Sequence, residues 1–214
     1  MIGRGLTAET LRALLEASYS GEPEPIYGWK EDSDLSTDTA HVYVNRNGQV
    51  VVAHRGTEGT VSDWGNNVKY ATTGEIGYKQ TDRFKESKEV QKAAEEKYGA
   101  DKITTIGHSQ GGLLAELLGK NSREIITVNK ATSPWSDNTA GSNQYDIRSE
   151  CDKVSMFRNP LKKERRNDTT IKAKKNWYGG CKDSVAEHSY DILNRRDKNE
   201  MFGDEEFTRD LDRK

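Results

Sequence analysis

Apolar and polar residues follow two periodicities along the chain, one typical of helices and one typical of strands. The first segment carries apolar residues at helical spacing, namely Leu11, Leu14, Leu15 and Tyr19. Thr7 precedes them at a position suited to a helix N-cap. We therefore expect an N-terminal helix, followed by a turn-rich stretch over 20–39.

Two β-rich segments, 41–45 and 49–54, are joined through Asn47-Gly48, a pair that accepts the positive φ of a hairpin turn. This pattern predicts a β-hairpin. The second segment contains the continuous apolar run 50–53, which does not alternate with polar residues. Such a strand is typically buried on both faces, so we expect it near the centre of a sheet.

Helical and β patterns alternate through the middle of the chain. A charged amphipathic pattern predicts a helix over 80–98, with Gly99 as its C-cap residue. A strand over 102–106, a helix over 111–118 and a strand over 124–129 follow. Shorter β candidates lie at 144–148, 153–157 and 169–174. This alternation predicts an α/β fold with a mostly parallel central sheet and flanking helices.

Composition narrows the possible classes of protein. The 214 residues include 33 basic and 35 acidic side chains and are 32% hydrophobic, so we expect a thin core under a solvated surface. No apolar run approaches the ~18 residues of a membrane span. Glu9, Arg12 and Glu16 interrupt the apolar segment near the N-terminus, which argues against a signal peptide and favours a cytoplasmic location by default. Without repeats or a linker, we expect one domain over 1–214.

The two cysteines, Cys151 and Cys181, are too few for a disulfide framework or a zinc ribbon. Since nothing in the sequence requires an oxidising compartment, we expect two free thiols. The alternative is a bridge, which would connect the segments around positions 152 and 188. Neither cysteine has a histidine placed to activate it as a nucleophile.

Residues 107–111 read Gly-His-Ser-Gln-Gly and match G-x-S-x-G, the pattern of a nucleophile elbow. A predicted strand ends at this motif and an apolar helix follows it, as the elbow requires. The tight turn would project the Ser109 hydroxyl above the sheet, while the glycines leave room for the close strand and helix. The amide of Gln110 would then face a developing oxyanion. The alternative is a glycine-rich turn with a bystander serine.

A second motif, taken together with this one, indicates a resemblance to a known family. The matching segments are, in chain order, 50–57 ending in Arg55-Gly56-Thr57, then Asp63-Trp64, 107–112, 125–134, Cys151-Asp152-Lys153-Val154 and His188. Together they resemble the class 3 lipases, the fungal-lipase-like α/β-hydrolases, over most of the chain. The resemblance implies an α/β-hydrolase fold and a serine hydrolase of carboxylic esters (a lipase, esterase or phospholipase) that needs neither a metal nor an organic cofactor.

The resemblance also implies roles for single residues. Ser109 would be the nucleophile, and the backbone amides of Thr57 and Gln110 would form the oxyanion hole. The chain departs from the family at one position, because Asn67 stands where an acid often follows the tryptophan by three residues. An amide there can accept a hydrogen bond from Thr57 but brings no charge. We therefore expect a differently tuned oxyanion loop.

The remaining members of a catalytic triad follow from chain order. In α/β-hydrolases the order is serine, acid, histidine, and of the four histidines only His188 comes after Ser109. Asp152 follows a β pattern and agrees with the family's Asp-x-Val, and Asp146 is the alternative acid. The side chain of His108, inside the motif, is expected to point away from the serine.

Substrate and partners are less constrained. The stretch from Lys153 to Lys175 holds nine basic and two acidic residues. It is interpreted most simply as a solvated loop, or alternatively as a contact with anionic lipid. Nucleic-acid binding is not expected, because no recognised binding fold accompanies it. A lid between Glu58 and Ile76 would offer few apolar residues, which favours short or medium acyl esters or phospholipids. The alternatives to an ester hydrolase are a catalytically silent interaction module, or a peptidase or acyltransferase with the same triad. The sequence predicts no oligomeric state.

Overall fold

The computed structural model describes residues 5–20, 26–56, 79, 81–132, 143–155, 168–173, 175–183 and 186–203. Several predictions of the sequence fall outside these residues. They concern Thr57 and Asn67, the lid considered between Glu58 and Ile76, and most of the basic segment from Lys153 to Lys175.

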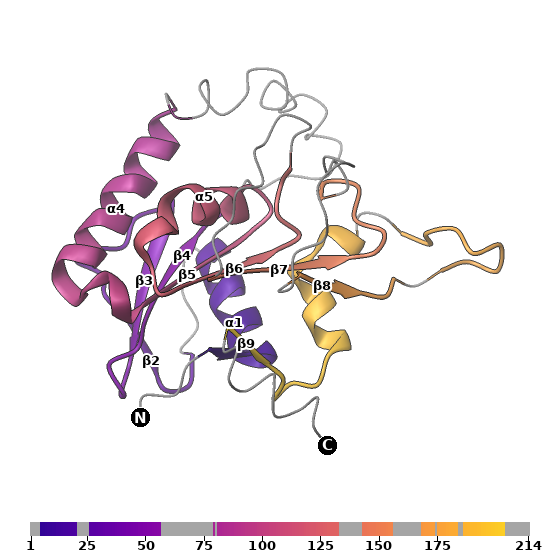
Figure 1. Cartoon of the computed structure of the whole chain (residues 1–214), viewed down its shortest axis with the longest axis horizontal. Helices are drawn as coiled ribbons and strands as arrows, with labels where there is room; N and C mark the ends of the chain where they lie inside the picture. Colours follow the sequence, from indigo (N-terminus) through magenta and orange to yellow (C-terminus); the bar gives the residue numbers. More distant parts are fainter. Residues whose placement is uncertain are drawn as a thin grey trace.

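A seven-stranded sheet organises the described part of the chain (Figure 1). In spatial order its strands are β2 (Trp29–Glu31), β3 (Ala40–Asn45), β4 (Val50–His54), β5 (Ile103–His108), β6 (Glu124–Val128), β7 (Gln144–Ser149) and β8 (Asp168–Ile171). β2, β3 and β4 pair antiparallel, whereas β4 to β8 pair parallel. The carboxyl ends of the parallel strands therefore meet at one edge, where open α/β sheets place their sites.

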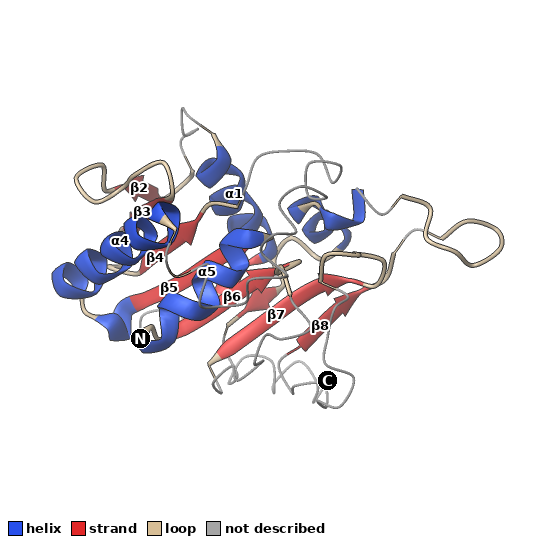
Figure 2. Ribbon diagram, turned by 90° about the horizontal axis from the view of Figure 1, so that it is seen from above, coloured by secondary structure: helices blue, strands red, loops and turns tan. Residues whose placement is uncertain are grey.

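Helices cover both faces of this sheet (Figure 2). α1 (Ala8–Tyr19) lies on one face, and α4 (Asp82–Tyr98) and α5 (Gln110–Leu118) lie on the other. The side chains of β4 alternate between the two faces of the sheet. Val51 and Ala53 belong to the core on the α1 side, and Val50 and Val52 belong to the core on the α4 side. All of β4 is buried, so the prediction from its continuous apolar run is confirmed.

Short elements complete the described fold. The 3-10 helices are η1 (Ala100–Lys102), η2 (Gly119–Asn121), η3 (Ala186–His188) and η4 (Tyr190–Arg195). A two-stranded sheet joins the ends of the described chain, because β1 (Leu6–Thr7) pairs antiparallel with β9 (Met201–Phe202). Ile192 and Leu193 of η4 and Phe202 of β9 pack in the same core as the leucines of α1.

The mostly parallel sheet with helices on both faces confirms the predicted α/β fold with a mostly parallel central sheet and flanking helices. Local expectations also hold: Thr7 caps α1 by accepting a 3.1 Å hydrogen bond from the Thr10 amide, and Gly99 follows α4. The strand predicted over 153–157 is wrong in its described part, 153–155, which forms a bend. The cause is Asp152, whose carboxylate accepts the amides of Val154 and Ser155 and so turns the chain.

The expectation of two free thiols is wrong. Cys151 and Cys181 form a disulfide, with their Cα atoms 5.7 Å apart. The bridge connects the residue before Asp152 to the chain that leads towards His188. None of the described helices has the length and apolar character that crossing a membrane requires.

Candidate active site

The turn between β5 and α5 holds Ser109 in a strained backbone conformation. Its φ of 57° and ψ of −123° are rare for a residue with a side chain. The turn is also very tight: a Cβ added to Gly107 would lie 2.1 Å from the Gly111 carbonyl oxygen, and one added to Gly111 would lie 2.1 Å from the His54 carbonyl oxygen. Only glycine fits at both positions, which explains why the motif carries glycines on either side of the serine.

Three side chains from distant parts of the sequence meet at this turn. His188 Nε2 lies 2.9 Å from Ser109 Oγ, and His188 Nδ1 lies 2.9 Å from Asp152 Oδ1. The serine is 3% exposed, the histidine 8% and the aspartate 0%. The structure therefore brings together the three residues that the sequence predicted as a triad.

Asp152 is fixed by its own backbone surroundings. Oδ1 accepts the amide of Val154 at 3.0 Å, and Oδ2 accepts the amide of Ser155 at 3.1 Å. With both oxygens engaged, the carboxylate cannot rotate away from the imidazole without losing hydrogen bonds. The disulfide at Cys151 anchors the adjacent residue.

This arrangement defines the tautomer of the imidazole. An ionised carboxylate only accepts hydrogen bonds, so His188 Nδ1–H donates to Asp152 and Nε2 is left to accept the Ser109 hydroxyl. That is the geometry of a general base acting on a nucleophile. Gln110 is the first residue of α5, where helix amides point out beyond the N-terminus.

Asp146, the alternative acid, lies elsewhere. It is buried on β7, where Oδ2 accepts Lys130 Nζ at 3.1 Å and Oδ1 accepts Thr127 and Gln144. Burial opposes its ionisation, but Lys130 and these hydrogen bonds prevail and lower its pKa to about 2. Lys130 also pairs with the buried Glu116 of α5. The group therefore fixes α5 against the sheet and leaves Asp152 as the acid in contact with His188.

The other histidines have different surroundings. His41 contacts Glu31 at 2.8 Å, and the buried His54 contacts Gln91 at 3.3 Å. His108 does not contact the serine hydroxyl: its Nε2–H donates to the His188 carbonyl at 2.5 Å, and its Nδ1 accepts the Tyr19 hydroxyl at 2.9 Å. Burial, with His188 nearby, lowers the pKa of His108 to about 3, so the ring is neutral at pH 7.

One residue beside the site was missed in the sequence. Asn129, directly after β6, donates to the backbone on both sides of His188 and has a φ of 45°. Asparagine tolerates the left-handed region better than most residues do. The signal available in the sequence was therefore an asparagine at the end of a predicted central strand. Nothing in the sequence indicated its long-range contacts.

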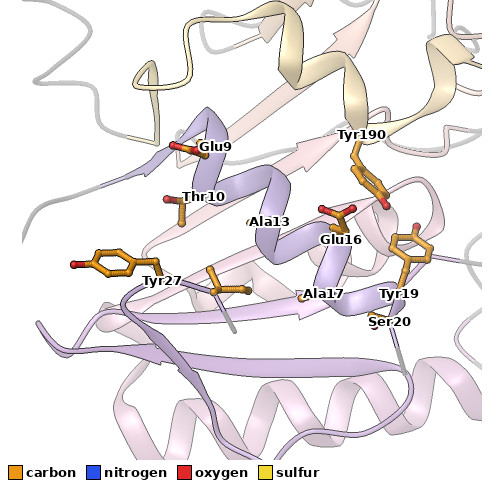
Figure 3. Close-up of a pocket in the computed structure, with 10 residues that line it drawn as sticks. Glu9, Thr10, Ala13, Glu16, Ala17, Tyr19, Ser20, Tyr27 and Tyr190 are labelled. Carbon is orange, nitrogen blue, oxygen red and sulfur yellow. The ribbon is translucent and has the colours of Figure 1, made fainter. Parts of the chain in front are cut away.

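A surface pocket of about 930 Å³ lies along α1 (Figure 3). Its lining runs from Glu9 and Tyr27 at one end to Tyr19 and Tyr190 at the other, and Ser109, Asp152 and His188 do not contribute to it. The pocket is thus separate from the candidate active site. Among the described residues, no group of three or more His, Cys, Asp or Glu side chains is arranged to hold a metal ion.

Comparison with known proteins gives a structural neighbour. No protein-family model matches the sequence, and no curated protein matches it. Among solved structures, the chain is similar to a triacylglycerol lipase from Penicillium expansum, with a TM-score of 0.46 and 18% identity over 86% of each chain. Lipase activity is a property of that fungal protein, and hydrolysis by the present chain is a separate proposal.

Proposed function

We propose that this protein is a serine hydrolase of carboxylic esters. The observation that supports it most is the pair of 2.9 Å hydrogen bonds joining Ser109 to His188 and His188 to Asp152. The strained serine turn is a second support, since unusual backbone conformations concentrate at functional sites. In this proposal Ser109 is the nucleophile, His188 the general base and Asp152 the acid that orients it.

The reaction follows from these roles. Ser109 Oγ forms a bond to the ester carbonyl carbon while its proton moves to His188 Nε2. The backbone amides of Gln110 and Thr57 donate to the resulting oxyanion. The bond to the alcohol oxygen then breaks, and that oxygen takes the proton from His188. Water attacks the acyl-enzyme in the same way, its proton passing through His188 to Ser109 as the carboxylic acid leaves.

The substrate we propose is an ester of a short or medium acyl chain, or a phospholipid, rather than bulk triacylglycerol. The sequence between Glu58 and Ile76 supplies few apolar side chains for a lid over a long acyl groove. The basic segment from Lys153 to Lys175 would attract anionic head groups. A series of esters of increasing chain length tests this, and highest rates on long-chain emulsions would contradict it.

Labelling with a fluorophosphonate probe tests the function itself, because the probe reacts with an activated serine. Wild type should be labelled and should hydrolyse a chromogenic ester, and Ser109→Ala should lose both. Ser87→Ala is the matched control: Ser87 is fully buried on α4, and its hydroxyl has no hydrogen-bond partner among the described residues. An unlabelled but folded wild type would indicate a silent interaction module, and turnover of amides or acyl transfer would indicate a peptidase or acyltransferase.

A further inference from the structure

The backbone around His188 is held by side chains from the carboxyl ends of two strands. Three successive carbonyl groups, those of Glu187, His188 and Ser189, accept side-chain hydrogen bonds. Asn129 Nδ2 donates to the first at 2.8 Å and to the third at 3.2 Å. His108 Nε2 donates to the second at 2.5 Å. The main chain that carries the imidazole is therefore fixed on both sides and in the middle.

Asn129 lies within the backbone contacts of the serine turn. The residue before it, Val128, accepts the Ser109 amide at 3.1 Å through its carbonyl group. Two residues after it, the Ala131 amide donates to the Ser109 carbonyl at 2.9 Å. A displacement of Asn129 would therefore displace the chain against which the serine backbone is held.

The remaining contacts of Asn129 reach the strand that leads to the acid. Its Oδ1 accepts the Ser149 amide at 2.8 Å, and its own amide donates to the Ile147 carbonyl at 2.8 Å. Ser149 ends β7, three residues before Asp152. The side chain is 0% exposed, and both its nitrogen and its oxygen are hydrogen-bonded. One buried amide thus connects the histidine segment to the strands that carry the serine turn and the acid.

We propose that Asn129 is a positioning residue, which sets the distance between the His188 imidazole and the Ser109 hydroxyl by fixing the backbone on both sides of the histidine. The proposal rests on the proposed function for its catalytic consequence. An error of about 1 Å in placing a catalytic group lowers the rate by about 10²-fold. Since Asn129 does not titrate, it holds the histidine segment in the same way at every pH at which the protein is folded.

Two substitutions and a matched control test the role. Asn129→Gly removes every side-chain contact while accepting the φ of 45°. Asn129→Asp keeps the shape and the oxygen that faces the Ser149 amide but loses both N–H donors. Asn143→Asp is the control, because the Asn143 amide donates to one backbone carbonyl, that of Ser122, at the opposite end of the sheet.

Each variant is titrated with the fluorophosphonate probe, and kcat is expressed per labelled serine, so that loss of folded protein does not lower it. For both Asn129 variants we expect kcat to fall about 10²-fold and KM to change less than about twofold, and for the control we expect neither to change by more than about twofold. Wild-type kcat per labelled site in folded Asn129→Gly and Asn129→Asp would overturn the proposal.

A measurement without substrate separates this proposal from the proposed function. The proton on His188 Nδ1 that is donated to Asp152 gives a downfield NMR signal, assigned by its loss in His188→Gln. We expect this signal to shift or broaden in Asn129→Gly and to persist unchanged in Asn143→Asp. An unchanged signal in Asn129→Gly would refute the positioning role. Absence of hydrolysis by wild type with the signal present would refute the proposed function alone.

Discussion

Lowering the pH from 7 to 5 is expected to destabilise the fold, because two histidines are buried in their neutral form. Burial lowers the pKa of His54 to about 4, with Arg83 adding to the shift and the hydrogen bond that His54 donates to Gln91 opposing it. Burial also lowers the pKa of His108 to about 3. Both rings are out of contact with solvent or nearly so, at 0% and 7% exposure, so neither can gain a hydrating shell when it is protonated.

The sign and size of the effect follow from proton binding. An unfolded histidine has a pKa of about 6.5, so below that pH the unfolded state binds more protons than the folded state and gains stability relative to it. One pKa unit corresponds to about 1.4 kcal/mol, and the interval from 6.5 to 5 spans about 1.5 units, so each histidine removes about 2 kcal/mol. Together, His54 and His108 lower the free energy of unfolding by about 4 kcal/mol.

The buried carboxylate of Asp146 does not contribute in this pH window. The pKa of Asp146 is lowered to about 2 by Lys130 and its hydrogen bonds, which outweigh its burial. Asp146 contributes its full stabilisation at pH values above the pKa of an unfolded aspartate. This contribution is lost only as the pH falls towards 2. Asp146 therefore does not offset the loss of stability that His54 and His108 cause between pH 7 and 5.

Urea denaturation at pH 7 and pH 5, at constant ionic strength, measures the loss. His54→Gln should reduce the difference between the two pH values by about half, to about 2 kcal/mol. Because each protein is compared with itself, a pH-independent effect of the substitution cancels. A wild type equally stable at both pH values, or a His54→Gln variant that keeps the full difference, would refute the reasoning.

Three further predictions concern stability. Cys151→Ala combined with Cys181→Ala should lower the free energy of unfolding by about 3–4 kcal/mol, because the bridge closes a loop with a sequence separation of 30. In urea denaturation the double variant should have the same free energy of unfolding as the reduced wild type. Gly111→Ala should lower stability by about 3 kcal/mol, since its Cβ would meet a carbonyl of β4, and an unchanged melting temperature would contradict the tight turn. Lys130→Met removes the cation that contacts the buried carboxylates of Glu116 and Asp146, and should lower the free energy of unfolding by about 3–5 kcal/mol in urea denaturation, more than Lys92→Met at an exposed ion pair does.

The features that the sequence predicted well are those with local causes. The serine turn could be placed at Ser109 because the glycines, the strand before and the helix after are all consecutive. His188 followed from chain order, and the structure places it 2.9 Å from the serine hydroxyl across 79 positions of sequence. β4 could be placed near the centre of the sheet because an uninterrupted run of apolar residues is typical of a strand that is buried on both faces.

Two of the features that it missed depend on partners far along the chain, and a third depends on a local hydrogen-bonded turn. Two cysteines thirty positions apart pair only because the fold brings them together, and nothing near Cys151 or Cys181 signals this. The strand expected after Asp152 fails because one carboxylate captures two amides, which competes with β pairing. Asn129 contacts residues 58 and 60 positions away, so its role could not be derived from its neighbours.

The pairing of β1 with β9 has a consequence for biosynthesis. Leu6 pairs with Phe202, and α1 packs against η4, so the first helix meets part of its core only when the last described strand has been made. As the nascent chain leaves the ribosome, the side of α1 that η4 will cover stays exposed until η4 has been synthesised. Closing contacts of such long sequence separation fold slowly and leave apolar surface open to aggregation. The connectivity of this chain therefore delays the burial of part of its core until residues 190–202 have been synthesised.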